Sequence, residues 1–209
     1  MAGRFESGSR NNVLKTLGLF VEPECVPPAV CRDIVERMLV APGESASVYV
    51  ADNESAVKPR ARKTLSVDVP PALDLIVRDR LEARRGDLAR HFGVTLERCE
   101  EPQYLVYGPG GFFRPHVDTR PPSDTHPLED AGRLVSAVIF LSTPDSTEPA
   151  DYDGGELRLF NLIDEPAWRG IGFACDAAPG LLLAFRSDTI HEVTPVTRGF
   201  RCAVATWFR

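Results

Sequence analysis

His116 and Asp118, a histidine and an aspartate one residue apart, are the first pair in this sequence whose types and spacing could do chemistry. They lie in a short segment, 112–118, that has the character of a β-strand. Side chains of a strand alternate between its two faces, so this imidazole and carboxylate would share one face, about 6.6 Å apart along the chain. Together they could supply two ligands of a 2-His-1-carboxylate metal site, which leaves positions open for substrate and dioxygen. A lone H-x-D also occurs by chance, and ordinary surface or turn chemistry is the alternative interpretation.

The third ligand of such a site would have to be a histidine on another strand, and three others are present. His91 ends an amphipathic helix, where a cation favours the negative end of the helix dipole, so we interpret it as structural. His126 lies in a loop rich in Pro, Ser, Asp and Thr, and we interpret it as structural or lid-forming. His191 follows an apolar strand after a short polar turn, which makes it the candidate for the third ligand.

Arg201 begins an otherwise uncharged strand-like segment, 201–208. Alternation places it on the same face as Ala203, Ala205 and Trp207. A guanidinium buried there without a partner would be costly, and a dicarboxylate cosubstrate would supply that partner. The alternative is an arginine that reaches solvent at the end of a strand. Arg198, in the preceding turn, is interpreted as exposed.

The elements that would position these residues change character along the chain. Amphipathic patterns that begin at proline pairs predict helices over 29–39 and from about 70 to 91, with short strands at 47–50 and 64–69. Short strand-like segments then follow at 103–107, 112–118, 134–142, 156–161, 181–185, 191–196 and 201–208. Many short strands predict a mostly β fold, a sandwich or jelly-roll barrel, with the N-terminal helices packed on its outside. Two long connections, 119–133 and 143–154, are the expected binding loops.

Composition narrows the class of protein. A chain of 209 residues, 43% of them hydrophobic, suits one domain, with support from about 1–100 and a core from about 101–209. The formal charge of −6 argues against nucleic acid or an anionic membrane as a partner. No apolar run approaches the roughly 20 residues of a membrane span. Five cysteines without C-x-x-C spacing indicate free thiols in a reducing cytoplasm.

Four ordered motifs carry a resemblance to a known family. They are the segment from Tyr107 to Asp118, the turn Gly154-Gly155-Glu156, the segment from His191 to Val196, and Gly199 with Arg201. Together they resemble the Fe(II)/2-oxoglutarate-dependent dioxygenases, most nearly the prolyl 4-hydroxylase-like group. The resemblance covers about 103–208 and implies a double-stranded β-helix, which is a jelly-roll barrel.

Residue by residue, the resemblance implies that His116, Asp118 and His191 bind Fe(II). Arg201 would hold the distal carboxylate of 2-oxoglutarate, and Tyr107 would donate a hydrogen bond to the same carboxylate. The implied cosubstrates are 2-oxoglutarate and O2, with ascorbate as an accessory reductant. The Gly154-Gly155 turn would have a structural role.

The activity that the resemblance implies is hydroxylation of an unactivated C–H bond, most nearly that of a prolyl residue in a peptide or protein. A free amino acid or another small metabolite is the alternative substrate. A jelly-roll binding or sensor module without turnover, and a metal-dependent hydrolase on the same barrel, are the alternatives from other classes. A binding or sensor module would predict that a metal ligand or Arg201 is lost. A hydrolase would need an additional acid or base near the metal.

Overall fold

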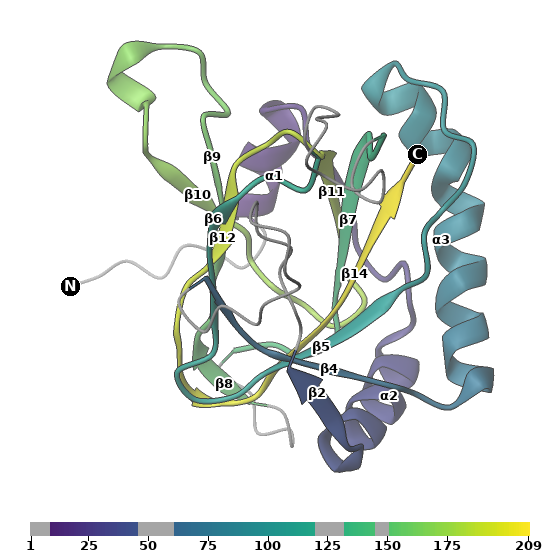
Figure 1. The fold of residues 1–209 in the computed structure, drawn as a ribbon. Coiled ribbons are helices and arrows are strands. Elements are labelled where there is room, and N and C mark those ends of the chain that lie inside the picture. The colour runs from purple at the N-terminus through teal and green to yellow at the C-terminus, as the bar shows by residue number, and fades with distance from the viewer. Residues whose placement is uncertain (1–8, 46–60, 120–131, 145–150) are drawn as a thin grey trace, which may run out of the picture.

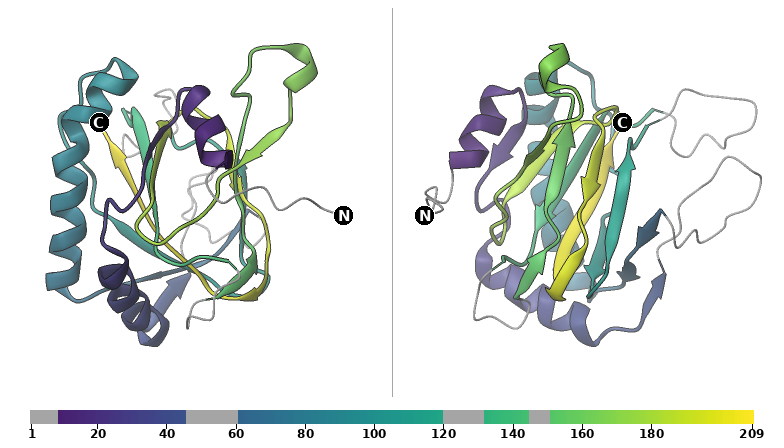
Figure 2. Two further views of the ribbon diagram at one scale, coloured as in Figure 1. Left: turned by 180° about the vertical axis from the view of Figure 1, so that it is seen from behind. Right: turned by 90° about the vertical axis from the view of Figure 1, so that its left-hand side faces the viewer.

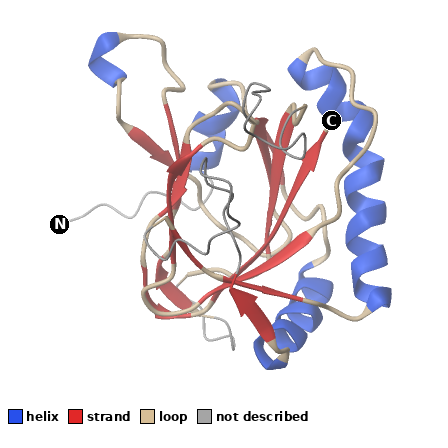
Figure 3. Ribbon diagram, in the orientation of Figure 1, coloured by secondary structure: helices blue, strands red, loops and turns tan. Residues whose placement is uncertain are grey.

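The structure, a computed structural model, describes residues 9–45, 61–119, 132–144 and 151–209. Within these ranges short strands predominate over helices (Figure 1, Figure 3). The helices are α1 (Ser9–Thr16), α2 (Pro28–Val40), α3 (Pro71–Phe92) and the 3-10 helix η1 (Pro166–Trp168). The strands are β1 (Phe20–Glu22), β2 (Gly43–Ser45), β3 (Arg62–Lys63), β4 (Leu65–Val67), β5 (Gln103–Tyr107), β6 (Phe112–His116), β7 (Val135–Phe140), β8 (Tyr152–Gly154), β9 (Leu157–Phe160), β10 (Gly172–Ala174), β11 (Leu182–Arg186), β12 (His191–Val193), β13 (Val196–Gly199) and β14 (Arg201–Phe208).

Most strands belong to two sheets that face each other (Figure 1). The major sheet has seven strands in the order β1-β11-β7-β14-β5-β4-β2, and the minor sheet has five in the order β10-β9-β12-β6-β3. Strands β13 and β8 form a separate antiparallel pair. Strands β5 and β14 are far apart in sequence but pair side by side in the major sheet. Strand β6, which directly follows β5, belongs to the minor sheet. The chain therefore passes back and forth between the two sheets. This is the predicted jelly-roll, which remains open at its edges.

The central strands of the major sheet, β11, β7, β14 and β5, are buried on both faces. Helices α2 and α3 lie along its outer face, and the minor sheet lies across its inner face (Figure 2). Strand β5 illustrates the alternation: Tyr104 and Val106 pack with the helices, whereas Leu105 and Tyr107 pack between the sheets. The helices therefore support the sheet from outside and leave its inner face to the site.

Prolines begin the two long helices, as the sequence predicts. Pro28 and Pro71 occupy the first turns of α2 and α3, where a missing N–H costs nothing. Helix α3 ends at Phe92, and the capping residue Gly93 that follows has a positive φ of 64°, the left-handed conformation common at helix ends. Within the described ranges, no helix combines the length and apolar character that crossing a membrane requires.

The structure corrects several predicted strands. Strand β6 ends at His116, so Asp118 lies two residues beyond the strand. The predicted strand 191–196 is interrupted before Pro195, which has no N–H to donate to a ladder, and the chain continues as β13. The predicted strand 47–50 lies outside the described residues. Elements α1, β1, β2, β3, β8 and β10 were not predicted, because segments this short carry too few residues for a periodic pattern.

A largely buried carboxylate, Glu100, joins the ends of two strands of the major sheet. Arg133, just before β7, donates to it from Nη2 at 2.7 Å and from Nε at 3.0 Å. Arg209, just after β14, donates to the same carboxylate. Burial alone would raise the pKa of Glu100, but the hydrogen bonds and charges of the two arginines outweigh it and lower that pKa. The cluster therefore stabilises the fold most when Glu100 is ionised.

Replacing Glu100 with glutamine is expected to lower the free energy of unfolding by about 2 kcal/mol at pH 7, because the hydrogen bonds from two partly buried guanidinium groups lose their charged acceptor. Since the folded pKa lies below the ordinary value of 4.5, this contribution is present above that pH and is lost as the pH falls through the folded pKa. Urea unfolding at pH 7 and pH 3 tests this. The difference between the proteins should shrink at pH 3, and the matched variant Glu101→Gln, at an 86% exposed side chain, should differ little at either pH.

Candidate active site

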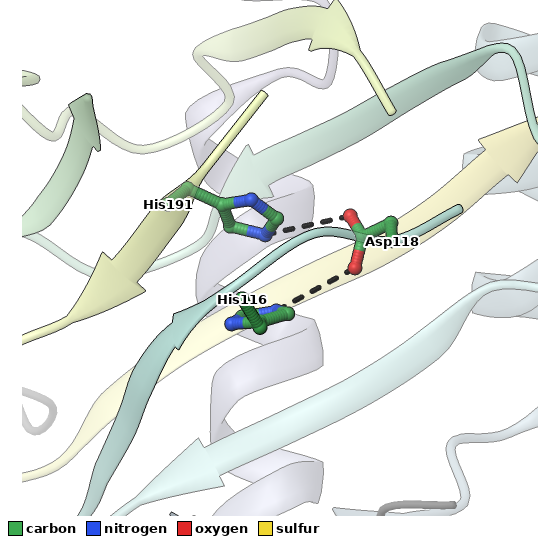
Figure 4. Close-up of side chains that lie close together, drawn as sticks. All are labelled: His116, Asp118 and His191. Carbon is green, nitrogen blue, oxygen red and sulfur yellow. Dashed lines mark ion pairs between the residues drawn. The ribbon is translucent and has the colours of Figure 1, made fainter. Parts of the chain in front are cut away.

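Two histidines and an aspartate converge between the sheets (Figure 4). His116 is the last residue of β6 and His191 is the first of β12, and the two pair directly across the antiparallel ladder. The ligand atoms of these residues and Asp118 all lie within 4.8 Å of one another. Nε2 of His116 is 3.5 Å from Oδ1 of Asp118, and Nε2 of His191 is 3.4 Å from Oδ2. This cluster, the triad, could hold one metal ion through two nitrogens and a carboxylate.

Backbone carbonyl groups orient both imidazoles of the triad. Nδ1 of His116 lies 2.8 Å from the carbonyl oxygen of Arg114, and Nδ1 of His191 lies 3.0 Å from that of Thr189. A carbonyl only accepts, so each Nδ1 carries the proton and each Nε2 presents its lone pair toward the centre. Burial lowers the pKa of His191 to about 4, so this imidazole is neutral near pH 7, the form that binds a metal.

The carboxylate of Asp118 is held by two donors from the major sheet. The hydroxyl of Ser136 donates to Oδ2 at 2.7 Å, and the side chain of Trp207 donates a second hydrogen bond. These two residues pair directly across β7 and β14. The backbone N–H of Asp118 donates to the carbonyl of Ser187 at 2.9 Å. Burial alone would raise the pKa of Asp118, but the positive charge that the imidazoles carry when protonated and the hydrogen bond from the indole outweigh it and hold that pKa well below its usual range.

Replacing Ser136 with alanine is expected to weaken metal binding by roughly 10- to 100-fold, because a partner that orients a ligand is lost. Titration of the protein with Mn(II) or Co(II) measures this without requiring turnover. Ser142→Ala is the control, since Ser142 is also a buried serine but bonds to the backbone N–H of Cys202 instead. Equal metal affinity in Ser136→Ala and wild type would contradict a role for this hydroxyl.

Arg201, the first residue of β14, is a buried cation that is only 2% exposed. Its guanidinium carbon lies 5.1 Å from the ring centroid of Tyr107 and 5.4 Å from that of Phe140. The guanidinium donates to the hydroxyl of Tyr152, while its Nε has no hydrogen-bond partner among the described residues. A buried guanidinium with an unused donor is suited to a carboxylate ligand, which would supply the missing counter-charge.

The paired glycines allow a turn to pack directly against Arg201. Gly154 and Gly155 both have positive φ, 72° and 61°. A Cβ on Gly155 would lie 3.0 Å from Cδ of Arg201 and 2.9 Å from a methyl group of Val196. A Cβ on Gly154 would lie 2.3 Å from the carbonyl oxygen of Pro195. The turn therefore needs glycine at both positions for steric reasons.

One cavity, the site cavity, joins the triad to Arg201. Its empty volume is about 530 Å³, counting the open space at its mouth. Ala203, Ala205 and Trp207 line it together with Arg201, the face of β14 that strand alternation predicts. Much of the remaining wall is apolar and includes Leu105, Val138, Leu157 and Val193. Such walls limit the access of water to a bound metal.

The structure places other residues singled out in the sequence away from this cavity. Nε2 of His91 lies 2.9 Å from the carbonyl of Gly18, where it links α3 to the turn before β1 and has the structural role predicted for it. Arg198 is exposed and forms ion pairs with Asp151 and Asp153. His126 and most of the two long loops lie outside the described residues.

Sequence reasoning missed three side chains that contact the predicted site residues. Tyr152 contacts Arg201 from a segment that was predicted to be loop. Ser136 contacts Asp118 from an apolar strand in which nothing distinguishes a buried hydroxyl. Trp207 was placed on the correct face by alternation, but its contact with Asp118 was not predicted. Tyr107, which was predicted, lies buried beside Arg201.

Solved structures share this fold. A prolyl-4-hydroxylase from Pseudomonas putida matches with a TM-score of 0.69 and 24% identity, covering 95% of each chain. A prolyl hydroxylase from Trichoplax adhaerens, solved with a hypoxia inducible factor peptide fragment, matches with a TM-score of 0.66 and 18% identity, covering 97% of this chain and 88% of the other. These similarities establish the double-stranded β-helix fold.

Sequence relatives lead to the same family. A PKHD-type hydroxylase from Teredinibacter turnerae is 36% identical over 114 residues, which cover 54% of this chain and 44% of the relative. One from Nitrobacter winogradskyi is 31% identical over 157 residues, 73% of this chain and 62% of the relative. The chain thus spans less than two thirds of the length of both relatives. The model of the 2OG-Fe(II) oxygenase superfamily matches residues 102–209, just over half of the chain. The chain therefore belongs to this superfamily, whose members use Fe(II), 2-oxoglutarate and O2.

Proposed function

We propose that this protein hydroxylates an unactivated C–H bond, and that its substrate is a prolyl residue of a peptide or protein. The observation that carries the proposal is the meeting of the triad and the buried Arg201 in one cavity. A metal site alone would suit several reactions, and a buried cation alone would suit many anions. Their combination fits a metal-bound dicarboxylate whose far end needs a counter-charge.

In this proposal His116, Asp118 and His191 hold Fe(II), and Ser136 and Trp207 keep the carboxylate in position. When bound, Fe(II) supplies O2 activation, in which 2-oxoglutarate is converted to succinate and CO2 while one oxygen atom enters the substrate. The two imidazoles are neutral ligands, and each keeps its proton on Nδ1, which donates to a backbone carbonyl oxygen. The apolar cavity wall excludes water from the reacting atoms.

Arg201 would hold the distal carboxylate of 2-oxoglutarate through the donors that it does not share with the Tyr152 hydroxyl. Tyr107 would contribute its phenol to the same carboxylate, and its ring lies 5.1 Å from the guanidinium carbon. The Gly154-Gly155 turn packs against the aliphatic part of Arg201 and limits its movement. These residues bind and orient the cosubstrate rather than transfer protons.

The choice of a prolyl substrate is supported by the names of the similar proteins, which are PKHD-type hydroxylases and prolyl hydroxylases. We propose a single oxygenase domain, in which the segments before residue 101 support the jelly-roll core. All five cysteines are free thiols, which supports a reducing cytoplasmic environment.

An anaerobic titration tests the proposal. Fe(II) and 2-oxoglutarate are added in turn, and the visible charge-transfer band of their chelate should appear only when both are present. Succinate formation in air, and the gain of one oxygen atom by prolyl peptides in mass spectrometry, would then test turnover. A folded protein that binds Fe(II) but gives no band with 2-oxoglutarate would contradict the oxygenase and favour a binding module or a hydrolase.

A further inference from the structure

A second arginine, Arg62, faces the site cavity and has no role in the scheme above. It lies on the short edge strand β3, opposite Phe113 of β6. Its Nε is buried without a hydrogen-bond partner, and it forms no ion pair with any residue in the described ranges. Arg62 and Arg201 are the two residues of the described chain that have a buried side-chain polar atom left unpaired, and both line this cavity.

Aromatic contacts place the Arg62 guanidinium beside the triad. Its central carbon lies 4.7 Å from the ring centroid of Phe113. That ring stacks on the imidazole of His116, with centroids 3.5 Å apart and planes inclined by 20°. A single phenyl ring therefore links this cation to a predicted metal ligand. A guanidinium stacked on an aromatic face has a restricted orientation and keeps its N–H donors at the edge available.

Among the described residues that line the cavity, no carboxylate is left over to balance the charge of Arg62. Asp118 is the one carboxylate among the described residues that line the cavity, and the triad uses it. With neutral imidazoles, the positive charges of Fe(II) and Arg201 equal the negative charges of Asp118 and 2-oxoglutarate. The loaded cavity then retains the charge of Arg62. A partly buried cation gains most from an anion that can accept two of its hydrogen bonds.

We propose that Arg62 binds a carboxylate of the substrate, close to the carbon that is hydroxylated. The inference rests on the proposed function and adds a chemical requirement, namely an acidic group near the target proline. The carboxylate has two possible sources: the free α-carboxylate of a terminal proline, or the side chain of a neighbouring acidic residue. Both present the planar pair of oxygens that a guanidinium binds.

Calorimetry with the loaded protein tests the inference. The protein is saturated with Mn(II) and 2-oxoglutarate, and two matched pairs of probes are titrated. The first pair is N-acetylproline and its amide, and the second is a capped glutamate–proline dipeptide and its glutamine counterpart. We expect the acid of at least one pair to bind about tenfold or more tightly than its neutral partner, since the bond is to a charged group. The pair that shows the preference identifies the source.

Variants connect the preference to Arg62. Arg62→Gln should reduce the preference for the acid over its neutral partner to less than twofold. Arg62→Lys should keep part of this preference, because the positive charge stays while the planar guanidinium is lost. Lys63→Gln is the matched control. It removes the same charge from the next residue, whose exposed side chain donates to the Pro109 carbonyl, and it should keep the full preference.

Failure of this inference is distinguishable from failure of the proposed function. If the charge-transfer band of Fe(II) and 2-oxoglutarate forms in both wild type and Arg62→Gln, the fold and the cosubstrate site are intact. Absence of an acid preference in both probe pairs would then overturn only the role of Arg62, as would an equal preference in Arg62→Gln. Absence of the band in wild type would instead overturn the oxygenase itself.

Discussion

Replacing Asp118 with alanine is expected to abolish Fe(II) binding at the triad and to reduce succinate formation to background. Its carboxylate is the one anionic ligand of the cluster, and two neutral imidazoles alone bind Fe(II) far more weakly. The loss should exceed the roughly 10- to 100-fold effects of changes in residues that only orient ligands. Equilibrium dialysis with Fe(II) under argon and the chelate band with 2-oxoglutarate measure both losses.

The Asp118→Ala variant should still fold. The pKa of His191 is lowered to about 4 by burial, so removing the carboxylate leaves a neutral imidazole rather than an unpaired buried charge near pH 7. Asp188→Ala is the control: Asp188 lies in the turn just before β12, and its side chain is 65% exposed. Unchanged succinate output from Asp118→Ala, with the fold shown intact, would refute the assignment of the triad.

Replacing Arg201 with glutamine is expected to weaken 2-oxoglutarate binding by about 30-fold or more while changing Fe(II) binding little. Loss of one partner of a buried, hydrogen-bonded charge pair costs about 2–5 kcal/mol, and each 1.4 kcal/mol is a factor of ten. Arg201 is only 2% exposed, so water cannot take the place of its guanidinium. The chelate band, titrated with 2-oxoglutarate at saturating Fe(II), gives the affinity directly.

Arg198→Gln is the matched control for Arg201. Arg198 is an arginine three residues earlier whose exposed guanidinium binds Asp151 and Asp153, so its loss should leave 2-oxoglutarate affinity unchanged. Arg201→Lys should be intermediate, because it keeps a charge but not the two-pronged geometry. Equal weakening of Fe(II) and 2-oxoglutarate binding in Arg201→Gln would indicate general damage to the site rather than loss of a carboxylate partner.

Local patterns determined much of the fold that the sequence could predict. Proline pairs located the starts of α2 and α3, and apolar runs located β5 and β14 with the bounds that the structure has. Alternation along β14 correctly put Arg201 and Trp207 on one face, because the two-residue period of a strand is a property of the backbone. The family, the jelly-roll fold and the cofactors were likewise predicted from motifs of a few residues each and are confirmed.

The candidate site was only partly predictable. Elimination among four histidines selected His191, and the structure places it across a ladder from His116, 75 residues earlier in the numbering. Asp118 was assigned to a strand that in fact ends at His116. Its position depends instead on the Ser187 carbonyl and the Ser136 hydroxyl, which come from other parts of the chain.

The sequence by itself determined which side chains could bind a metal and a dicarboxylate, since residue type and spacing along one strand are local properties. Only the tertiary structure decided what surrounds them: the Ser136 and Trp207 donors, the Tyr152 partner of Arg201, and Arg62, whose buried Nε has no hydrogen-bond partner among the described residues. The physical reason is the register between strands. The register brings together residues that are far apart in the chain. It depends on the packing of the helices and both sheets together, so it cannot be predicted from any short segment.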